Sequence, residues 1–198
     1  MKIADISDRQ LEIIGAAGKI LTSEGVNGLT IKNLAKQMQF SEAAIYRHFT
    51  SKEEIILAML NYLAESMDER YSGLSKVGNP EDRVSALFQE QFRFFNMNPH
   101  FVVAVFSDGL MEESKRINEA IARIMAVKVK HLAPALREGQ REGIFINVVP
   151  ADDLLHIVMG SFRLLMFKWR ISNFHFDIKK AGDKLIQSVL ILIKNKKS

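Results

Sequence analysis

The sequence predicts an all-α protein with an N-terminal three-helix helix-turn-helix domain and a larger C-terminal helical domain. Apolar residues recur at helical spacing along most of the 198-residue chain, with no strand-like alternation of any length. Helix start signals precede these patterns, and three of the four prolines stand where helices are expected to begin. The composition, 47% hydrophobic and 25% charged, is that of an ordinary globular protein and excludes a disordered chain.

The first predicted helix begins after Ser7, because Ser7 and Gln10 have the spacing of a capping box. Four apolar residues then fall on one face of this helix: Leu11, Ile14, Ala17 and Leu21. Gly25 and Gly28 mark the turn that follows it.

Two short helices and a long one are predicted next. Thr30 is placed to cap a helix over residues 31–38, and Ser41 to cap another over 42–49. Ser51 and Glu54 form a second capping box, which opens a helix that runs to about Tyr71. Two short helices joined by a tight turn and framed by longer ones describe a helix-turn-helix.

The second short helix is expected to have an inner and an outer face. Ile45 and Phe49 are four residues apart and share one side, so we expect them to point inward. Arg47 then projects nearly opposite that side, with Tyr46 and His48 beside it. The helix therefore offers polar side chains to a partner.

This outer face has the side chains of a DNA-binding surface. Ala43 and Ala44 are small enough for close entry into a major groove, where Arg47 can donate to guanine or phosphate. Ser41 and the amides after it form a helix N-terminus that attracts phosphate. Glu42 is better explained as a complement to the positive helix N-terminus, since a carboxylate repels phosphate.

Five short motifs stand between residues 11 and 60: Glu24-Gly25, Leu29-Thr30, Leu34-Ala35, Tyr46-Arg47-His48-Phe49 and Ser51-Lys52-Glu53-Glu54. Through this combination, residues 11–60 resemble the TetR family of bacterial regulators. The resemblance implies DNA contacts from these positions: Thr30, Lys32, Ser41, Glu42, Ala43, Ala44, Tyr46, His48 and Lys52, to which the face argument adds Arg47. One departure is Gln39, which stands in the interhelical turn where the family usually has glycine, at a position that favours positive φ.

Helices are also predicted along the rest of the chain. Asn79-Pro80 and Asn98-Pro99 each supply a cap followed by a proline. A long helix is expected over about 113–142, kinked or split at Pro134. Two more follow, at 151–171 and, after an Asp177 cap, at 178–194.

The TetR resemblance implies that the C-terminal domain holds a ligand cavity and that its last two helices form a dimer. The helix over 151–171 carries Leu155, Val158, Met159, Phe162 and Met166, and the helix over 178–194 carries Ile178, Ala181, Leu185, Ile186, Val189 and Ile193. Gly182 permits close contact there, although both helices could instead cover the core of a monomer. Large adaptable side chains are the predicted ligand-binding residues: Phe88, Phe92, Phe95, Phe101, Met125, Phe162, Met166 and Trp169. Each of them could equally fill an ordinary core.

Several classes of site and protein are not expected. The chain has no cysteine and its histidines are scattered, so we predict neither a metal site nor a cofactor. No hydrolase, protease, nucleotide-binding or dinucleotide-binding motif is present, and an enzyme is not expected. The N-terminus lacks a signal peptide and no apolar run spans a bilayer, which favours a cytoplasmic protein with no membrane association.

The sequence therefore predicts a DNA-binding domain over residues 1–50 and a ligand-binding and dimerisation domain over 51–198. The expected protein is a homodimeric repressor that binds a palindromic double-stranded DNA operator and is released by a small apolar or aromatic effector. The alternative is an architectural DNA-binding protein controlled by a protein partner, which a fully filled aromatic core would favour.

Overall fold

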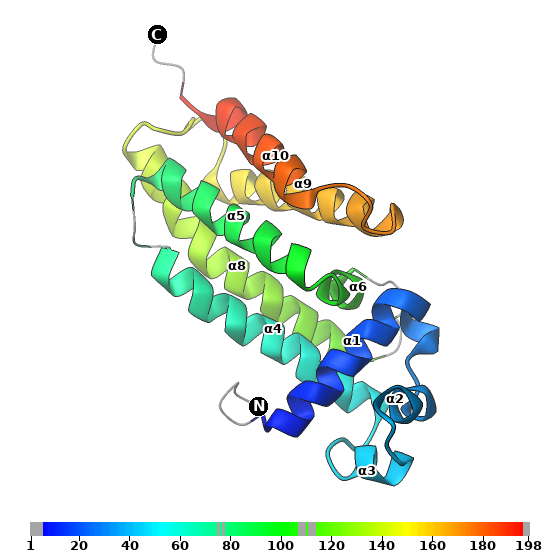
Figure 1. Ribbon diagram of the computed structural model, residues 1–198. Helices are drawn as coiled ribbons and strands as arrows, with labels where there is room; N and C mark the ends of the chain where they lie inside the picture. Colours follow the sequence, from blue (N-terminus) through cyan, green and yellow to red (C-terminus); the bar gives the residue numbers. More distant parts are fainter. Residues whose placement is uncertain (1–5, 75, 77, 107–109, 111–113, 196–198) are drawn as a thin grey trace. The chain divides into compact units, whose positions relative to one another are not determined.

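The protein is described from a computed structural model, which covers residues 6–74, 76, 78–106, 110 and 114–195 (Figure 1). Within these ranges the secondary structure is helical, apart from one isolated β-bridge between Phe145 and Lys194. The predicted all-α fold is confirmed. Among the described residues, no helix is long and apolar enough to cross a membrane.

The chain forms two compact units. The first contains Met1–Ser66 and Asn98–Met125, and the second contains Met67–Met97 and Ala126–Ser198. The predicted boundary after residue 50 stays a prediction.

The first unit contains three complete helices near the N-terminus, a short helix farther along, and the first parts of two long helices. These are α1 (Asp8–Gly28), α2 (Ile31–Met38), α3 (Glu42–Tyr46), α6 (His100–Val105), α4 (Lys52–Leu74) and α8 (Lys115–Arg141). The Ser7 capping box is confirmed, because Ser7 and Gln10 exchange side-chain and backbone hydrogen bonds. Gly25 leaves helical geometry with φ 70° and ψ −166°, as its role in a turn predicts.

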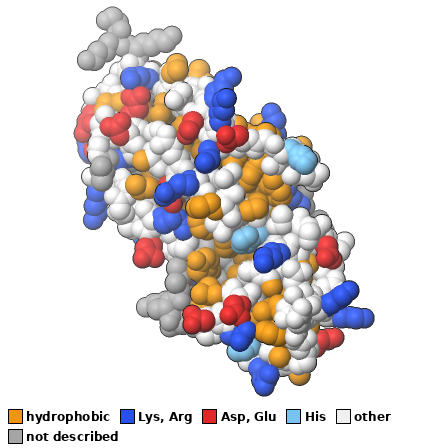
Figure 2. Space-filling view, in the orientation of Figure 1, with side chains coloured by type: hydrophobic (Ala, Val, Ile, Leu, Met, Phe, Trp, Pro, Cys, Tyr) orange, Lys and Arg blue, Asp and Glu red, His pale blue; other side chains and the backbone are white. Residues whose placement is uncertain are grey.

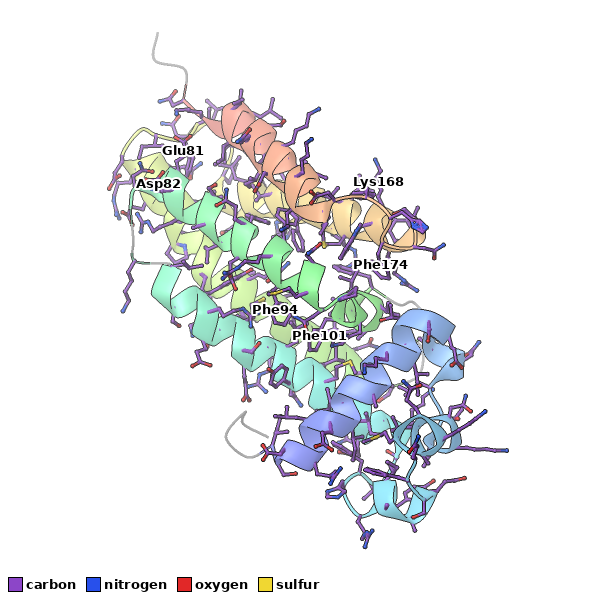
Figure 3. The ribbon with its side chains drawn as sticks, viewed as in Figure 1. Glu81, Asp82, Phe94, Phe101, Lys168 and Phe174 are labelled. Atoms are coloured by element: carbon purple, nitrogen blue, oxygen red, sulfur yellow. The ribbon has the colours of Figure 1, made fainter. Side chains whose placement is uncertain are left out.

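The core of the first unit is built on α1. Its buried apolar residues are Ile13, Ile14, Ala17, Ile20 and Leu21, whereas Leu11, predicted on the same face, is exposed. Helix α6 packs against α1 at Gly18, where an added Cβ would lie 2.7 Å from the His100 ring. Phe101, labelled on α6 in Figure 3, stacks on Tyr62 with the ring centroids 6.2 Å apart.

The second unit contains α5 (Pro80–Met97), α9 (Ala151–Ile171), α10 (Ile178–Ile193) and the remaining parts of α4 and α8. Helix α10 packs on both α5 and α9 (Figure 1). At Gly182 the approach to α5 is so close that a Cβ would lie 2.4 Å from the Phe92 ring. Glycine is therefore required on α10 by a contact within the chain.

Start signals in the second unit act as the sequence predicts. Asn79 Oδ1 accepts a hydrogen bond from Asp82 N at 3.0 Å, and α5 begins at Pro80. Asp177 Oδ1 accepts from the first amides of α10. Of the two outcomes expected at Pro134, a kink or a split, the split does not occur, since α8 continues through this proline as one helix. Glu113, where this helix is predicted to begin, lies outside the described residues.

Candidate nucleic-acid interface

Helices α2 and α3 both begin at a capping side chain. Thr30 Oγ1 accepts a hydrogen bond from Asn33 N at 3.0 Å, and Ser41 Oγ accepts one from Ala44 N at 3.2 Å. Between the helices, Gln39 adopts φ 57° and ψ 38°, which is left-handed backbone. Both caps are confirmed, and so is the positive φ in the turn.

Helix α3 is shorter than the predicted 42–49, since it spans only the five residues Glu42–Tyr46. Beyond Tyr46, His48 N donates to Ile45 O at 2.9 Å, an i to i−3 bond that tightens the backbone into a turn. Phe49 N also donates to Ile45 O, at 3.1 Å. Phe49 lies outside the five-residue helix, but its i to i−4 bond keeps it on the same side as Ile45, as helical spacing predicts.

The predicted inner and outer sides of this segment are confirmed. Ile45 is fully buried and Phe49 is 5% exposed, whereas Tyr46 is 50% exposed. Arg47 and His48 are also exposed. The two apolar residues anchor the segment to the first unit, and the polar side chains between them remain accessible to a partner.

All ten residues predicted to contact DNA lie in the first unit. Eight are exposed, namely Thr30, Lys32, Ser41, Glu42, Ala43, Tyr46, Arg47 and His48, while Ala44 and Lys52 are half-buried. Lys36 is exposed as well, and its i, i+4 relation to Lys32 is a sequence signal that our prediction did not use. Several Lys and Arg side chains extend outward around α2 and α3 (Figure 2).

The first turn of α1 contacts the chain just before and just after α3. Gln10 Nε2 donates to His48 O at 3.4 Å, and the Arg9 guanidinium lies over the Phe40 ring, 5.0 Å from its centroid. Helix α1 thus contacts the chain on both sides of α3.

An ion-pair cluster joins the beginnings of α4 and α8. Ser51 Oγ accepts from Glu54 N at 3.2 Å, which caps α4. Arg116 lies 2.9 Å from a carboxylate oxygen of Glu54 and 3.6 Å from one of Glu53, and the hydrogen bond to Glu54 raises the pKa of Arg116. Ser114 Oγ donates to Glu53 Oε1.

A pocket of about 570 Å³ opens beside this cluster, within the first unit. Its lining comes from Gln10, His48, Phe49, Thr50, Glu54, Leu57, Ala58, Asn61, Arg116, Glu119, Ala120 and Arg123. Arg123 donates to Asn61 Oδ1 and Glu65 Oε1, each at 3.2 Å, so both arginines of the pocket are paired. Sequence reasoning missed this pocket because its walls come from segments far apart in the chain.

Six of the eight predicted ligand-binding residues are buried in the second unit: Phe88, Phe92, Phe95, Phe162, Met166 and Trp169. Phe162 is central, with its ring centroid 5.5 Å from Phe88, 5.3 Å from Phe92 and 6.3 Å from Phe95. Phe101 and Met125 belong to the first unit, and Met125 is 46% exposed. The structure does not group these two with the other six.

Comparisons with known proteins agree with this architecture. Residues 13–59 match the family described as bacterial regulatory proteins, tetR family. The nucleoid occlusion factor SlmA of Vibrio atlanticus is 32% identical over 161 residues, which cover 78% of this chain and 82% of that protein. The chain belongs to the TetR family. It is therefore a DNA-binding regulator, and its relatives are regulators, not enzymes.

Solved structures of TetR-like regulators share the fold of this chain. The ketosteroid regulator KstR2 of Mycobacterium tuberculosis superposes with a TM-score of 0.80 at 19% identity, covering 97% of this chain and 98% of that one. FadR of Bacillus subtilis, solved in complex with stearoyl-CoA, gives 0.76 at 17% identity, covering 91% and 97%.

TetR-family regulators usually act as dimers. In this chain α9 carries an exposed apolar stripe. Its exposed members are Ile157, Leu164, Phe167 and Ile171, and α10 adds Ile191 and Leu192. These are not the residues from which the sequence predicts the interface. Leu155, Val158, Phe162 and Met166 are buried within the chain, and Gly182 contacts Phe92, because the second unit uses that side of each helix for its own core.

Proposed function

We propose that this TetR-family regulator is a cytoplasmic homodimeric repressor that is released from a palindromic operator by a small, largely apolar effector. The observation that carries the DNA-binding part is the burial of Ile45 and Phe49 beside the exposed Tyr46 and Arg47. A helix anchored on one side and polar on the other suits insertion into a major groove. Two copies in one dimer would reach successive grooves, about 34–36 Å apart.

The DNA contacts follow from the same geometry. Tyr46 and Arg47 face the bases or the adjacent phosphates, and the Ser41-capped start of α3 offers its amides to a phosphate oxygen. Thr30, Lys32, His48 and Lys52 bind the flanking backbone, while Ala43 and Ala44 keep the approach close. Glu42 complements the N-terminus of α3 and reads no base in this proposal.

The effector site is assigned to the aromatic interior of the second unit. Phe88, Phe92, Phe95 and Phe162 supply apolar surface, and Met166 and Trp169 extend it along α9. The stearoyl-CoA complex of the FadR structure supports the apolar part of the assignment, because the stearoyl chain of that ligand is apolar and the fold is similar. Effector binding can shift the DNA-binding equilibrium only by its difference in affinity for the two states.

The test begins with the selection of duplexes from a random pool by the purified chain, followed by gel shift. Tyr46→Ala and Arg47→Ala are each expected to weaken binding to the selected operator by roughly 5- to 150-fold, since each removes about 1–3 kcal/mol of contact. Lys19→Ala is the matched control, because Lys19 is an exposed cation on α1 of the same unit but outside the proposed surface. Unchanged affinity in both α3 variants would contradict the assignment.

A second function is favoured by the relationship to SlmA. That relative is a nucleoid occlusion factor, which supports an architectural DNA-binding role under the control of a protein partner. The mutual packing of Phe88, Phe92, Phe95 and Phe162 also fits a filled core without an effector. Operator release by small molecules in the gel shift would decide for the repressor.

A further inference from the structure

Lys128 of α8 is a lysine inside the aromatic interior of the second unit. Lys128 is only 8% exposed, and its ammonium lies over the face of the Phe162 ring, 3.4 Å from the ring centroid. A ring face attracts a cation, but it does not replace the water that a charged ammonium loses on burial. Burial accordingly lowers the pKa of Lys128 to about 7.

Two other half-buried cations of this unit, Arg70 and Arg83, lie beside carboxylates. Arg70 also lies over a ring, that of Phe94, and its Nε is 3.2 Å from Glu90 Oε1 (Phe94 is labelled on α5 in Figure 3). Arg83 donates to both carboxylate oxygens of Glu138. Among the described residues, none forms a hydrogen bond or an ion pair with the Lys128 ammonium.

Gln91 supplies a second unused donor in the same interior. It is 1% exposed, and its Oε1 accepts a hydrogen bond from Tyr71 Oη at 2.6 Å. Its Nε2 has no partner in the part of the chain that the structure describes. A buried amide nitrogen without an acceptor is costly, and a ligand oxygen would remove this cost.

Both donors belong to one aromatic cluster. Phe88, Gln91, Phe92 and Phe95 share one face of α5, because they lie three or four residues apart. The three phenylalanines of that face surround Phe162, and Lys128 covers the ring of Phe162. The cluster thus combines buried aromatic side chains with two donors for which the described residues supply no acceptor.

We propose that Lys128 binds the anionic head of the effector, which is a hydrocarbon or aryl carboxylate whose apolar body lies among these phenylalanines. Gln91 Nε2 donates to the same carboxylate. One ammonium and one amide match a single negative charge, and the surrounding rings exclude a polyanion or a second polar group. This inference rests on the proposed function, because it specifies the charge of the effector bound in the second unit.

The probes are two acids, decanoate and 4-phenylbutanoate, each compared with its alcohol, decanol and 4-phenylbutanol. Binding to the full-length chain is followed by calorimetry and by the fluorescence of Trp169, the single tryptophan. Trp169 lies on α9 with Phe162. Its ring packs edge-on against that of Phe174, also labelled in Figure 3, with the ring centroids 4.8 Å apart. At least one acid is expected to bind tenfold or more tightly than its alcohol at pH 6.

Lys128→Met is expected to abolish this preference for the acid and to leave binding of the alcohol unchanged. Lys115→Met is the matched control, since Lys115 is on the same helix with a side chain that is 91% exposed. Thermal unfolding at pH 6 shows whether Lys128→Met folds, and we expect it to unfold at a higher temperature than the parent chain because a buried charge is removed. Equal binding of acid and alcohol, no binding of any probe, or an acid preference that survives in Lys128→Met would each overturn the inference.

The same proteins in a gel shift separate this inference from the proposed function. Operator release by the alcohols alone would overturn the anionic effector and keep the ligand-responsive repressor. Absence of sequence-selective DNA binding would reject the repressor itself, whatever the probes do to the second unit.

Discussion

Gln39 adopts φ 57° and ψ 38°, a conformation that costs an L-residue about 1–2 kcal/mol. Gln39→Gly is expected to stabilise the chain by roughly 0.5–1 kcal/mol, because glycine removes this strain but gains freedom in the unfolded state. Urea unfolding at constant protein concentration measures the difference. Gln37→Gly is the control: it lies inside α2 and should destabilise the chain by about 1 kcal/mol. A loss of stability at position 39 would contradict the strain argument.

His100 predicts a pH dependence at the contact between α6 and α1. Burial lowers the pKa of His100 from 6.5 to about 4, while its ring packs against Gly18. Between these two pKa values the unfolded chain binds a proton that the folded chain does not. Stability from the neutral ring is therefore complete above pH 6.5 and is lost as the pH falls toward 4.

The loss at His100 is at most about 1.4 kcal/mol for each pH unit in this window. His100→Gln removes the titration, so its unfolding free energy should fall less than that of the parent chain between pH 6.5 and 4.5. Carboxylates such as Asp68, whose pKa is lowered by its hydrogen bonds to Lys130 and His131, also lose stabilising contacts in acid. They do so in both proteins, and the difference between the proteins isolates His100. Parallel curves would show that the ring contributes nothing.

At the scale of the element, helix α3 depends on its cap. With only five residues it cannot persist by propensity alone, and Ser41 Oγ satisfies one of its first amides. Ser41→Ala should cost about 1 kcal/mol, speed hydrogen exchange of the α3 amides and weaken operator binding. Ser41→Asp restores the cap but adds a negative charge beside the DNA. Slow exchange combined with weak binding in Ser41→Asp would separate the two roles of this residue, and slow exchange in Ser41→Ala would refute the dependence on the cap.

The start of a helix could be predicted from the sequence where the hydrogen bond that caps it joins residues close together in the chain. The caps at Ser7, Thr30 and Ser41 each bond to an amide three residues away, so the sequence contains the whole interaction. The sequence predicts that α3 ends at residue 49, whereas the structure ends it at Tyr46. The backbone tightens there because the Ile45 carbonyl accepts from His48 N as well as from Phe49 N, and the spacing of apolar residues does not predict this. Periodicity also left open which side of α9 is inside, since both sides are apolar.

The candidate sites also contain residues that local spacing could predict and residues that it could not. Tyr46 and Arg47 could be placed on the outer face from their spacing to Ile45 and Phe49. Lys128 could not be recognised, because its burial depends on Phe162 from another helix, and a lysine in an amphipathic helix is ordinarily solvated. Long-range packing, absent from any local pattern, determines both this residue and the pocket of the first unit.

At the scale of the whole molecule, the proposed homodimer makes operator affinity depend on dimerisation, because one copy alone would read only half of the proposed palindrome. The exposed residues Ile157, Leu164, Phe167 and Ile171 lie on α9 at intervals of three, four and seven residues, the spacing of a helix-packing seam. Gly160 lies on the same side, and a Cβ there would meet no other atom within 4 Å. The chain's own packing therefore does not require this glycine, whereas a neighbouring helix in close contact would.

Leu164→Glu tests this seam. The side chain is 60% exposed in the single chain, so the change should alter monomer stability by less than about 0.5 kcal/mol. In a dimer it places a carboxylate in an apolar interface, where a loss of about 1.4 kcal/mol already raises the dissociation constant tenfold. Light scattering should show a monomer at concentrations where the parent chain is dimeric, with a matching loss of operator affinity. Val148→Glu, at a site 83% exposed and outside α9, should remain dimeric, and an intact Leu164→Glu dimer would move the interface elsewhere.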